Sequence, residues 1–385
     1  KYENSPDTCK QISMGIVLKR RDGSGIMKHI FVIVPSGSLD SPIRGACALA
    51  NELSNLNCVT FVTLKGRRDA YKLLNNRVDI VDLACHKSWY KKLRVLKKLL
   101  VCKSDNGKAV TISMGLSADF LNSWCGDVAT TCSSVRGDLP KAYVQIYGSL
   151  GKLAAYLHLK RLRKINHVVS MTKSMALLVE SYIGRNSPVI GNFVDEFSLE
   201  KYRRKNQLKG AYKFVYTGSL TNGKQPSLLV SAISELLDRD LNVELDILGM
   251  GPLLAPLRLQ VNNLSKPDAV NFYGFLEKPY TKVSNADVLV LPSLTEGVSR
   301  SVLEALYLGI PCVLRNIEGS SEVILPGVNG ELFQKDKELA DTMLRAAVFS
   351  RTKLSDRKIL TLSDYRQESA VRKYITLLQL DCLMP

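Results

Sequence analysis

The 385-residue sequence lacks several features that identify particular classes of protein. It has only four histidines, and none of its nine cysteines forms a CxxC pair, so neither a zinc site nor a disulfide framework is expected. Scattered cysteines favour a reducing cytoplasm. No window approaches the roughly 18 apolar residues that a membrane-spanning helix needs. Aromatic residues are few, at 7%, and no nucleic-acid motif is present, which argues against a nucleic-acid binder.

The first 26 residues are polar and glycine-punctuated, and they lack the apolar stretch and cleavage site of a signal peptide. A natural-looking start follows at Met27, in MKHIFVIVP. We therefore interpret residues 1–26 as a lead-in with no assigned function. The length predicts two domains, because one hydrophobic core rarely serves so long a chain.

Positive charge is concentrated in the N-terminal half of the sequence. Residues 1–200 hold 29 Lys and Arg against 16 Asp and Glu, whereas residues 201–385 hold 24 against 20, within a total net charge of +17. A basic surface of this kind suits a polyanionic partner, such as an anionic lipid or a phosphorylated substrate.

Strands of the buried type alternate with amphipathic helices in both halves of the chain. Runs such as HIFVIVP and DVLVLP are followed by polar loops and then by helical periodicity, a pattern typical of parallel sheets in α/β domains. Ligands of such domains bind at the carboxyl ends of the strands. We predict an N-terminal domain, a hinge, a C-terminal domain and a final amphipathic helix, at residues 27–190, 191–210, 211–360 and 361–385.

Two glutamates, Glu296 and Glu304, lie eight positions apart in the otherwise apolar segment 292–314. Glu296 follows a strand, and Gly297 permits close approach to the backbone. Ser299 is the predicted N-cap of a helix whose first N–H groups form an anion site. Both carboxylates can then accept hydrogen bonds from the hydroxyls of one ligand. The alternative is a solvated loop glutamate and a helix glutamate paired with a nearby base.

Two other motifs carry less information. The sequence LGMGPL contains Gly249 and Gly251 but has Leu at position 254, so it is only half of a dinucleotide fingerprint and argues against a nicotinamide enzyme. The sequence DRD at 238–240 imitates a metal-binding Asp-x-Asp, but its place at a helix end favours a solvated turn. No metal site is predicted.

The segment 286–333 resembles the signature of glycosyltransferase family 4, the large group 1 family of retaining enzymes. Its strand ADVLVLPS, its Glu-x7-Glu pair and the motifs EALYLGIPCV, GSSEVI and GVNGELF follow one another at the family's spacing. Other segments are similar to the family's phosphate loop, glycine turn, nucleobase segment and interdomain hinge: YTGSL…GK at 216–224, ILGMGP at 247–252, VNFYGF at 270–275 and GNFVDE at 191–196.

The resemblance implies a GT-B fold, in which two Rossmann-like domains with parallel sheets face a central cleft and a C-terminal helix crosses back. It also implies that Glu296 faces the hydroxyls of a donor sugar, that Glu304 binds the ribose, and that Lys224 stabilises the diphosphate. The predicted catalytic residues are Glu296, Lys224 and Arg300. The predicted donor-binding residues are Gly37, Gly218, Ser219, Lys224, Gly249, Gly251, Phe272, Tyr273, Glu296, Gly297, Val298, Ser299, Arg300 and Glu304.

The sequence departs from the family's pattern at three places. Ser219 stands where the family usually has arginine, so one phosphate-binding cation is missing. Arg300 either replaces it, or contacts a sugar or acceptor substituent, or pairs with one of the two glutamates. Gly37 is expected to supply the close approach of the family's paired glycines, and Arg136 stands where a histidine is frequent, which leaves the general base unassigned.

The segment 87–103 is a basic amphipathic helix with an aromatic residue near one end. Such a helix either lies on an anionic membrane or packs its apolar stripe into the core of the domain. Its apolar stripe is Trp89, Leu93, Leu96 and Leu100. The basic residues expected to contact the membrane are Lys91, Lys92, Arg94, Lys97 and Lys98.

These observations predict a retaining, metal-independent transferase that needs no cofactor. It would move a hexose or N-acetylhexosamine from a nucleotide-diphosphate sugar, most commonly a UDP sugar, to a lipid-linked saccharide or lipopolysaccharide-type acceptor. We expect it in the cytoplasm, peripheral on the inner face of the membrane. The alternative is a non-catalytic nucleotide-sugar-binding partner subunit.

Overall fold

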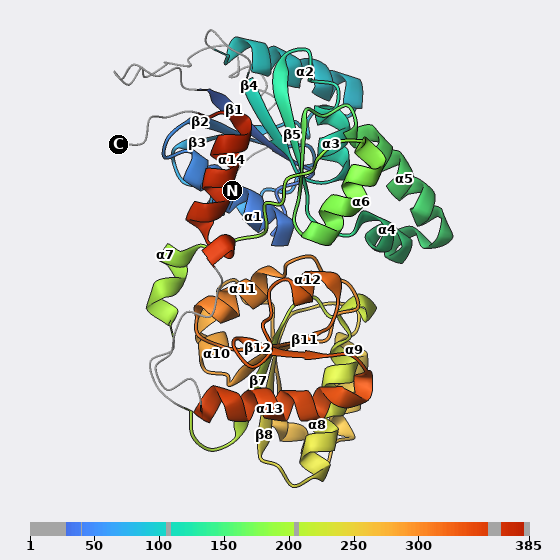
Figure 1. Cartoon of the computed structure of the whole chain (residues 1–385), viewed down its shortest axis with the longest axis vertical. Helices are drawn as coiled ribbons and strands as arrows, with labels where there is room; N and C mark the ends of the chain where they lie inside the picture. The colour runs from blue at the N-terminus through green and yellow to red at the C-terminus, as the bar shows by residue number, and fades with distance from the viewer. Residues whose placement is uncertain (1–27, 40, 105–108, 204–207, 353–362, 381–385) are drawn as a thin grey trace.

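The computed structural model describes residues 28–39, 41–104, 109–203, 208–352 and 363–380. The lead-in predicted for residues 1–26 lies outside these ranges. Within them, the strands form two six-stranded sheets, one in each half of the chain (Figure 1).

The N-terminal sheet has the strand order β3-β2-β1-β4-β5-β6, and all of its neighbouring strands are parallel. This is the order of a doubly wound sheet, in which the direction of winding reverses between β1 and β4. Its strands are β1 (His29–Val34), β2 (Cys58–Thr63), β3 (Val78–Asp82), β4 (Ala109–Ser113), β5 (Ala129–Val135) and β6 (His167–Ser170).

The C-terminal sheet repeats this topology with the order β12-β11-β10-β7-β8-β9, again with parallel neighbours. Its winding reverses between β7 and β10. Its strands are β7 (Tyr212–Thr217), β8 (Val243–Leu248), β9 (Val270–Gly274), β10 (Val288–Leu291), β11 (Cys312–Arg315) and β12 (Gly330–Phe333). The prediction of two parallel α/β sheets is confirmed.

Helices connect successive strands and cover both sheets. Those of the N-terminal half are α1 (Ser41–Leu53), α2 (Trp89–Cys102), α3 (Leu116–Asn122), α4 (Leu139–Tyr147), α5 (Gly151–Leu162), α6 (Lys173–Ile183) and α7 (Glu196–Leu199). Those of the C-terminal half are α8 (Pro226–Asp238), α9 (Leu254–Asn262), α10 (Tyr280–Ser284), α11 (Arg300–Tyr307), α12 (Glu318–Ser321), α13 (Leu339–Thr352) and α14 (Gln367–Leu378).

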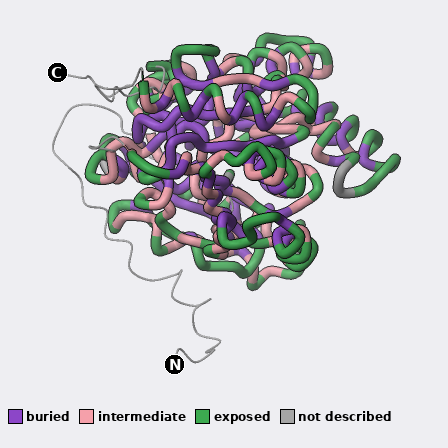
Figure 2. Tube along the Cα trace, turned by 90° about the horizontal axis from the view of Figure 1, so that it is seen from below, coloured by how far each residue is buried: buried purple, intermediate pink, exposed green. Residues whose placement is uncertain are grey.

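The apolar segments HIFVIVP and DVLVLP form the central strands β1 and β10 of the two sheets. Residues 30–34 of β1 and 288–291 of β10 are buried on both faces, as strands sandwiched between helices must be. Figure 2 shows the buried segments running through the interior of both halves, with exposed segments around them.

The last helix, α14, returns to the N-terminal half of the molecule. In Figure 1 it lies beside α1, and Ala370, Val371 and Tyr374 belong to the same buried cluster as β1 and α1. The Tyr374 hydroxyl also donates to Ser134 Oγ, 3.0 Å away. The predicted crossing of the C-terminal helix back to the first domain is therefore confirmed.

The apolar stripe of α2 faces the interior of the protein. Leu93, Leu96 and Leu100 are buried and pack in a cluster with Phe31 and Val62 of the sheet. The structure supports the prediction of a domain helix with these three leucines in the core, so they are not available to a membrane, whereas Trp89 at the start of the stripe is 49% exposed.

Candidate active site in the interdomain cleft

A cavity of about 580 Å³ lies between the two halves, at the carboxyl ends of their strands. The N-terminal half contributes residues from the start of α1 and from the segments after β5 and β6. The C-terminal half contributes the loops that follow β7, β8, β9 and β10. The cavity therefore occupies the position at which doubly wound sheets bind their ligands.

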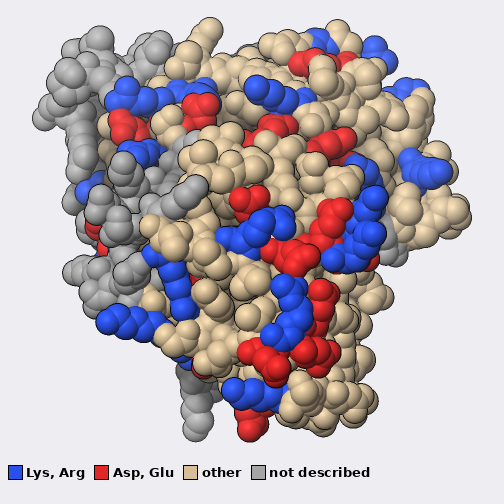
Figure 3. Space-filling model, turned by 60° about the horizontal axis from the view of Figure 1, so that its bottom comes forward, with Lys and Arg blue, Asp and Glu red and all other residues tan. Residues whose placement is uncertain are grey.

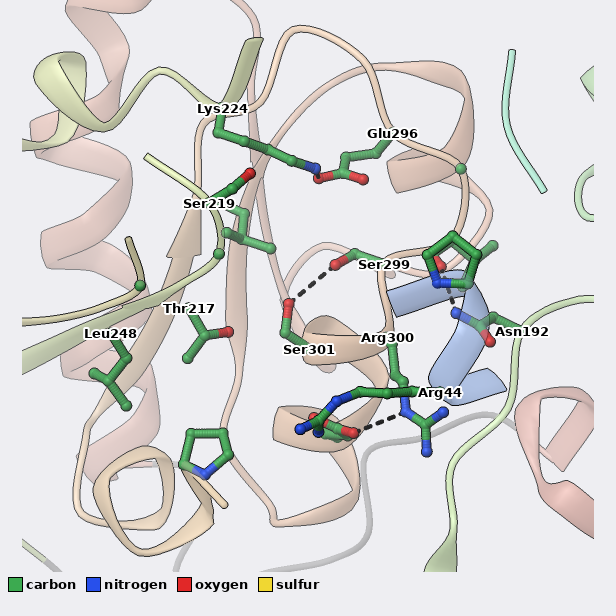
Figure 4. Close-up of a pocket in the computed structure, with 18 of the residues that line it drawn as sticks. Arg44, Asn192, Thr217, Ser219, Lys224, Leu248, Glu296, Ser299, Arg300 and Ser301 are labelled. Carbon is green, nitrogen blue, oxygen red and sulfur yellow. Dashed lines mark hydrogen bonds and ion pairs between the residues drawn. The ribbon is translucent and has the colours of Figure 1, made fainter. Parts of the chain in front are cut away.

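The loop after β10 and the start of α11 form one wall of the cavity. Ser299 is the N-cap of α11, as predicted, but its hydroxyl lies 3.0 Å from Ser301 Oγ instead of capping the helix (Figure 4). At its other end the helix stops before Gly309, whose φ of +81° suits glycine. The first residues of α11, from Ser299 to Ser301, line the cavity, and a helix start leaves its first N–H groups without intrahelical partners, as an anion site requires.

Glu296 and Lys224 meet on this wall although they are 72 residues apart in the chain. Their side chains form an ion pair (Figure 4), and Ser293 Oγ donates to the same Glu296 oxygen from 3.1 Å. Their side chains are 17% and 28% exposed, respectively, so both polar ends remain accessible from the cavity. The pair places one ammonium and one carboxylate beside the start of α11.

Arg300 and Glu304 form a second ion pair, one helical turn apart on α11. Arg300 Nε lies 3.0 Å from Glu304 Oε1, and each side chain is 12% exposed. Arg300 Nη1 is buried and has no hydrogen-bond partner among the described residues. Pairing with a glutamate is one of the three roles that the sequence left open for Arg300. The pair does not satisfy the buried Nη1 donor of Arg300.

The two halves are joined directly beside this wall. Asn192 donates from Nδ2 to the Val298 carbonyl at 3.1 Å, and its Oδ1 accepts from Arg136 Nη2 at 2.7 Å. Burial lowers the pKa of the Arg136 guanidinium, with a further contribution from Arg300 that Tyr374 opposes. Arg136 still remains protonated at neutral pH. Asn192 thus holds a cation of the N-terminal half against a loop of the C-terminal half.

Close backbone packing explains the glycines of the loops after β7 and β8. A Cβ at Gly249 would lie 1.8 Å from the Gly218 carbonyl oxygen, and one at Gly251 would lie 2.4 Å from that of Leu220. The Tyr216 hydroxyl donates to the Ser219 carbonyl at 2.8 Å, which anchors the same loop. These contacts support the loop that presents Lys224.

Ten of the residues predicted to bind the donor line the cavity, and four do not. Those in the lining are Gly218, Ser219, Lys224, Gly249, Glu296, Gly297, Val298, Ser299, Arg300 and Glu304. Outside it lie Gly37, Gly251, Phe272 and Tyr273. Gly37 pairs its N–H with the Arg67 carbonyl at 2.9 Å, and Tyr273 stacks under Lys282, with 3.8 Å from Nζ to the ring centre.

The sequence did not predict several of the residues that line the cavity. Arg44 of α1 reaches the cavity and donates to the Glu277 carbonyl of the other half at 3.3 Å. Thr217 lines it with a buried Oγ1 that has no partner among the described residues. Met171 accepts a hydrogen bond from the Val298 N–H at 3.1 Å. Thr217 stands inside the motif YTGSL…GK but was not predicted to bind a ligand, and Arg44 and Met171 belong to none of the motifs.

Within the described ranges, no group of three or more His, Cys, Asp or Glu side chains is arranged to hold a metal ion. The same residues include no helix that is both long and apolar enough to cross a membrane.

Comparisons with known proteins agree with this geometry. The family model described as "Glycosyl transferases group 1" matches residues 198–347. Protein CapJ of Staphylococcus aureus is 29% identical over 181 residues, which cover 45% of this chain and 42% of CapJ. The UDP-Gal:alpha-D-GlcNAc-diphosphoundecaprenol alpha-1,3-galactosyltransferase of Escherichia coli is 28% identical over 190 residues, covering 45% of this chain and 46% of that protein. The chain thus aligns with less than half the length of these relatives.

The similarity of fold extends over nearly the whole chain. The crystal structure of Anabaena HepE in complex with UDP and glucose superposes with a TM-score of 0.71 at 14% identity, covering 91% of this chain and 99% of HepE. At this identity the superposition establishes the fold alone. The matched family model thus assigns residues 198–347 to the group 1 glycosyltransferases, and the two facing sheets of the whole chain have the GT-B fold.

Proposed function

We propose that the protein is a retaining glycosyltransferase that uses a UDP sugar and a lipid-linked saccharide or lipopolysaccharide-type acceptor. The observation that carries this proposal is the meeting of Glu296, Lys224, Glu304 and the start of α11 in one interdomain cavity. The names of the Escherichia coli relative, with its UDP-galactose donor and diphosphoundecaprenol-linked acceptor, and of the HepE complex support this choice of substrates.

In the proposed complex, the donor lies along the wall formed by α11. Lys224 and the first N–H groups of α11 hold the diphosphate, Glu296 accepts hydrogen bonds from the sugar hydroxyls, and Glu304 accepts them from the ribose. Binding of the donor separates Lys224 from Glu296, because each then contacts a different part of the ligand. The ion pair keeps both side chains facing the cavity until then.

The proposed reaction forms a bond between the acceptor oxygen and the anomeric carbon of the sugar while the bond to the diphosphate breaks. The acceptor's proton passes to an oxygen of the leaving diphosphate, which takes the place of a protein base. Lys224 and the helix start stabilise the negative charge that develops on the leaving group. Positive charge for this step comes from the protein, so we propose that no metal ion is required.

Arg300 is assigned to the donor diphosphate, in place of the cation missing at Ser219. Its Nη1 is buried beside the cavity and has no partner in the described part of the chain, and burying an N–H donor unsatisfied is costly. Arg300→Gln should therefore weaken binding of UDP and leave binding of uridine unchanged. Calorimetry that finds equal losses for both ligands would remove the residue from the diphosphate and favour a purely structural ion pair.

A lipid-linked acceptor would bring the protein to the inner face of the cytoplasmic membrane. Of the basic residues predicted for this contact on α2, Lys91, Arg94 and Lys98 are exposed. Lys92 donates to the Leu64 carbonyl at 2.5 Å, and Lys97 pairs with Asp127 at 2.7 Å. We propose that the three exposed side chains add electrostatic attraction to anionic lipid, since the apolar stripe of α2 is buried.

A screen of nucleotide sugars for thermal stabilisation tests the proposed function, followed by mass analysis of products formed on lipid-linked acceptors. We expect UDP sugars to raise the melting temperature and one of them to be consumed. A non-catalytic binding subunit would be stabilised equally but would release no UDP with any donor and acceptor. Stabilisation by none of the nucleotide sugars would contradict both functions.

A further inference from the structure

We propose that the hairpin formed by α4 and α5, together with the aromatic cluster beside it, docks the protein onto an anionic lipid surface. The hairpin stands out from the body of the N-terminal half, at the right of Figure 1 and Figure 2. The proposal rests on the proposed function and adds a second membrane contact to it, because the leucines of α2 are buried.

The tip of the hairpin is apolar and exposed. Leu150, between the two helices, is 72% exposed, and Leu153 is 58% exposed. The other exposed apolar side chains of the hairpin are Val144, Tyr147, Tyr156 and Leu157. Monomeric proteins rarely leave so many large apolar side chains together in water unless the surface has a partner.

The exposed side chains of α5 become more basic towards its end. Leu153 and Leu157 lie on its first turns beside the exposed Lys152, and the exposed basic residues that follow are Lys160 in α5 and Arg163 and Lys164 just after it. Lys160 Nζ lies 5.6 Å from the ring centre of Tyr156. A surface with an apolar tip and basic residues behind it matches the acyl chains and the phosphates of an anionic leaflet.

Negative charge is absent from this part of the sequence. No Asp or Glu occurs between Leu139 and Val179, a stretch with seven Lys and Arg. Over the middle of the face drawn in Figure 3, by contrast, basic and acidic side chains are interleaved. The charge of the hairpin therefore complements an anionic surface, and this argues for lipid in preference to a second copy of the same basic patch.

Both tryptophans of the sequence lie in the aromatic cluster next to α5. Trp89 at the start of α2 and Trp124 after α3 are 49% and 40% exposed, with 6.2 Å between ring centres. Arg161 of α5 covers Trp124 at 4.3 Å and Phe120 at 5.1 Å. Exposed tryptophans beside basic side chains are typical of the lipid–water interface.

The hairpin is firmly attached to its domain and begins at the cleft. Tyr143 of α4 and His158 of α5 hydrogen-bond to each other at 2.8 Å, and His158 Nε2 lies 3.0 Å from the buried Asp119 of α3. At the start of α4, Lys141 Nζ lies 4.0 Å from Glu318 of the other half. The base of the hairpin thus lies where the two halves of the molecule meet.

Binding to phosphatidylglycerol vesicles tests the proposal, and the two tryptophans report on the surface without a label. We expect the protein to co-sediment with these vesicles, to ignore pure phosphatidylcholine vesicles, and to show a blue-shifted emission that brominated lipid quenches. Changing the three exposed leucines of the hairpin to glutamine should weaken binding at least about tenfold. The variant is Leu150→Gln, Leu153→Gln and Leu157→Gln.

Two comparison variants separate the hairpin from general effects. Removing three exposed apolar side chains of the C-terminal half should leave binding unchanged. This control is Leu259→Gln, Leu325→Gln and Val328→Gln. Removing the exposed basic side chains at the end of α5 and just after it should weaken binding about fivefold per residue. That variant is Lys160→Gln, Arg163→Gln and Lys164→Gln.

Vesicle binding that is absent in the wild type, or equal in wild type and leucine variant, would overturn the proposal. So would a dimer in sedimentation velocity that the leucine variant abolishes, since the surface would then bind a second copy. Thermal stabilisation by UDP, measured on every variant, checks folding and tests the proposed function separately. Loss of vesicle binding with UDP stabilisation retained supports the docking surface.

Discussion

At the scale of single residues, the central pair is Lys224 and Glu296, which come from different loops and meet on the cavity wall. Lys224→Ala should weaken binding of UDP about ten- to hundredfold, because a hydrogen bond to a charged group contributes about 1.5–3 kcal/mol. Calorimetric titration measures this. Lys282→Ala is the matched control, since Lys282 contacts Tyr273 and Asp246 outside the cavity lining. The affinity of this variant for UDP should equal that of the wild type.

Glu296 is expected to act on the sugar and not on the nucleotide. Glu296→Gln should lower kcat at least about a hundredfold, as loss of a stabilising group at a reacting centre does, while UDP affinity is unchanged. Initial rates of UDP release measure kcat, and calorimetry measures the affinity for UDP. Full turnover in the variant would take Glu296 out of the reaction.

The sequence predicted Glu296 and Lys224 as site residues, but it did not predict the contacts that the residues around them make. Glu296 and Lys224 belong to motifs with fixed spacing, so their meeting was foreseeable. The bond from Arg136 to Asn192 spans 56 residues and crosses the domain boundary, and no periodicity encodes such a contact. The unsatisfied Thr217 hydroxyl is likewise visible only when the fold encloses it.

At the scale of elements, the loops after β7 and β8 depend on close backbone contact. Gly249→Ala would place a Cβ 1.8 Å from the Gly218 carbonyl oxygen, so the loops must move apart. We expect a loss of about 1–3 kcal/mol in unfolding free energy, together with weaker UDP binding. Urea unfolding measures the first. Gly126→Ala, where a Cβ meets nothing within 4 Å, should leave both quantities unchanged.

The attachment of α4 and α5 rests on a buried polar network around Asp119. Its carboxylate accepts from Ser113 Oγ at 2.6 Å, from Ser133 Oγ at 2.7 Å, and lies 3.0 Å from His158 Nε2. Asp119→Ala should cost at least about 3 kcal/mol, because buried groups left without a partner cost about 1–3 kcal/mol each. Unfolding by denaturant, monitored by tryptophan fluorescence, measures this loss of unfolding free energy. An unchanged midpoint in the variant would contradict the expectation.

Strands and helices of the fold were largely predictable, whereas this network was not. HIFVIVP and DVLVLP read as buried strands because both of their faces are covered by helices. In α5 the outward side chains Leu153 and Leu157 are apolar, so periodicity alone did not separate the face that meets the core from the face that meets solvent. For the same reason the periodicity did not predict the proposed docking surface, whereas the amphipathic pattern of α2 predicted a membrane contact on that helix.

At the scale of the whole molecule, contacts across the cleft hold the two halves together. The carboxylate of Glu322 accepts hydrogen bonds from the Lys173 N–H at 3.0 Å and 3.1 Å, at the start of α6 in the other half. A carboxylate at a helix start contributes about 0.3–1 kcal/mol, and more when partly buried. These contacts favour the arrangement of the two halves that the structure shows.

Glu322→Ala should therefore open the cleft. We expect a larger radius of gyration in small-angle scattering, and a smaller difference from the wild type once UDP is bound. Glu244→Ala, which removes a surface pair with Lys213 within the C-terminal half, should scatter as the wild type does. Equal radii for all three proteins would show that Glu322 does not control the opening.

The measurement that most directly tests the central claim is a calorimetric titration of UDP into the wild type and into Lys224→Ala, with EDTA present. The cavity predicts one UDP bound per chain without a metal ion, and an affinity about ten- to hundredfold lower in the variant. No binding of UDP to the wild type, or equal affinity in the two proteins, would contradict the assignment of this cavity to a UDP sugar.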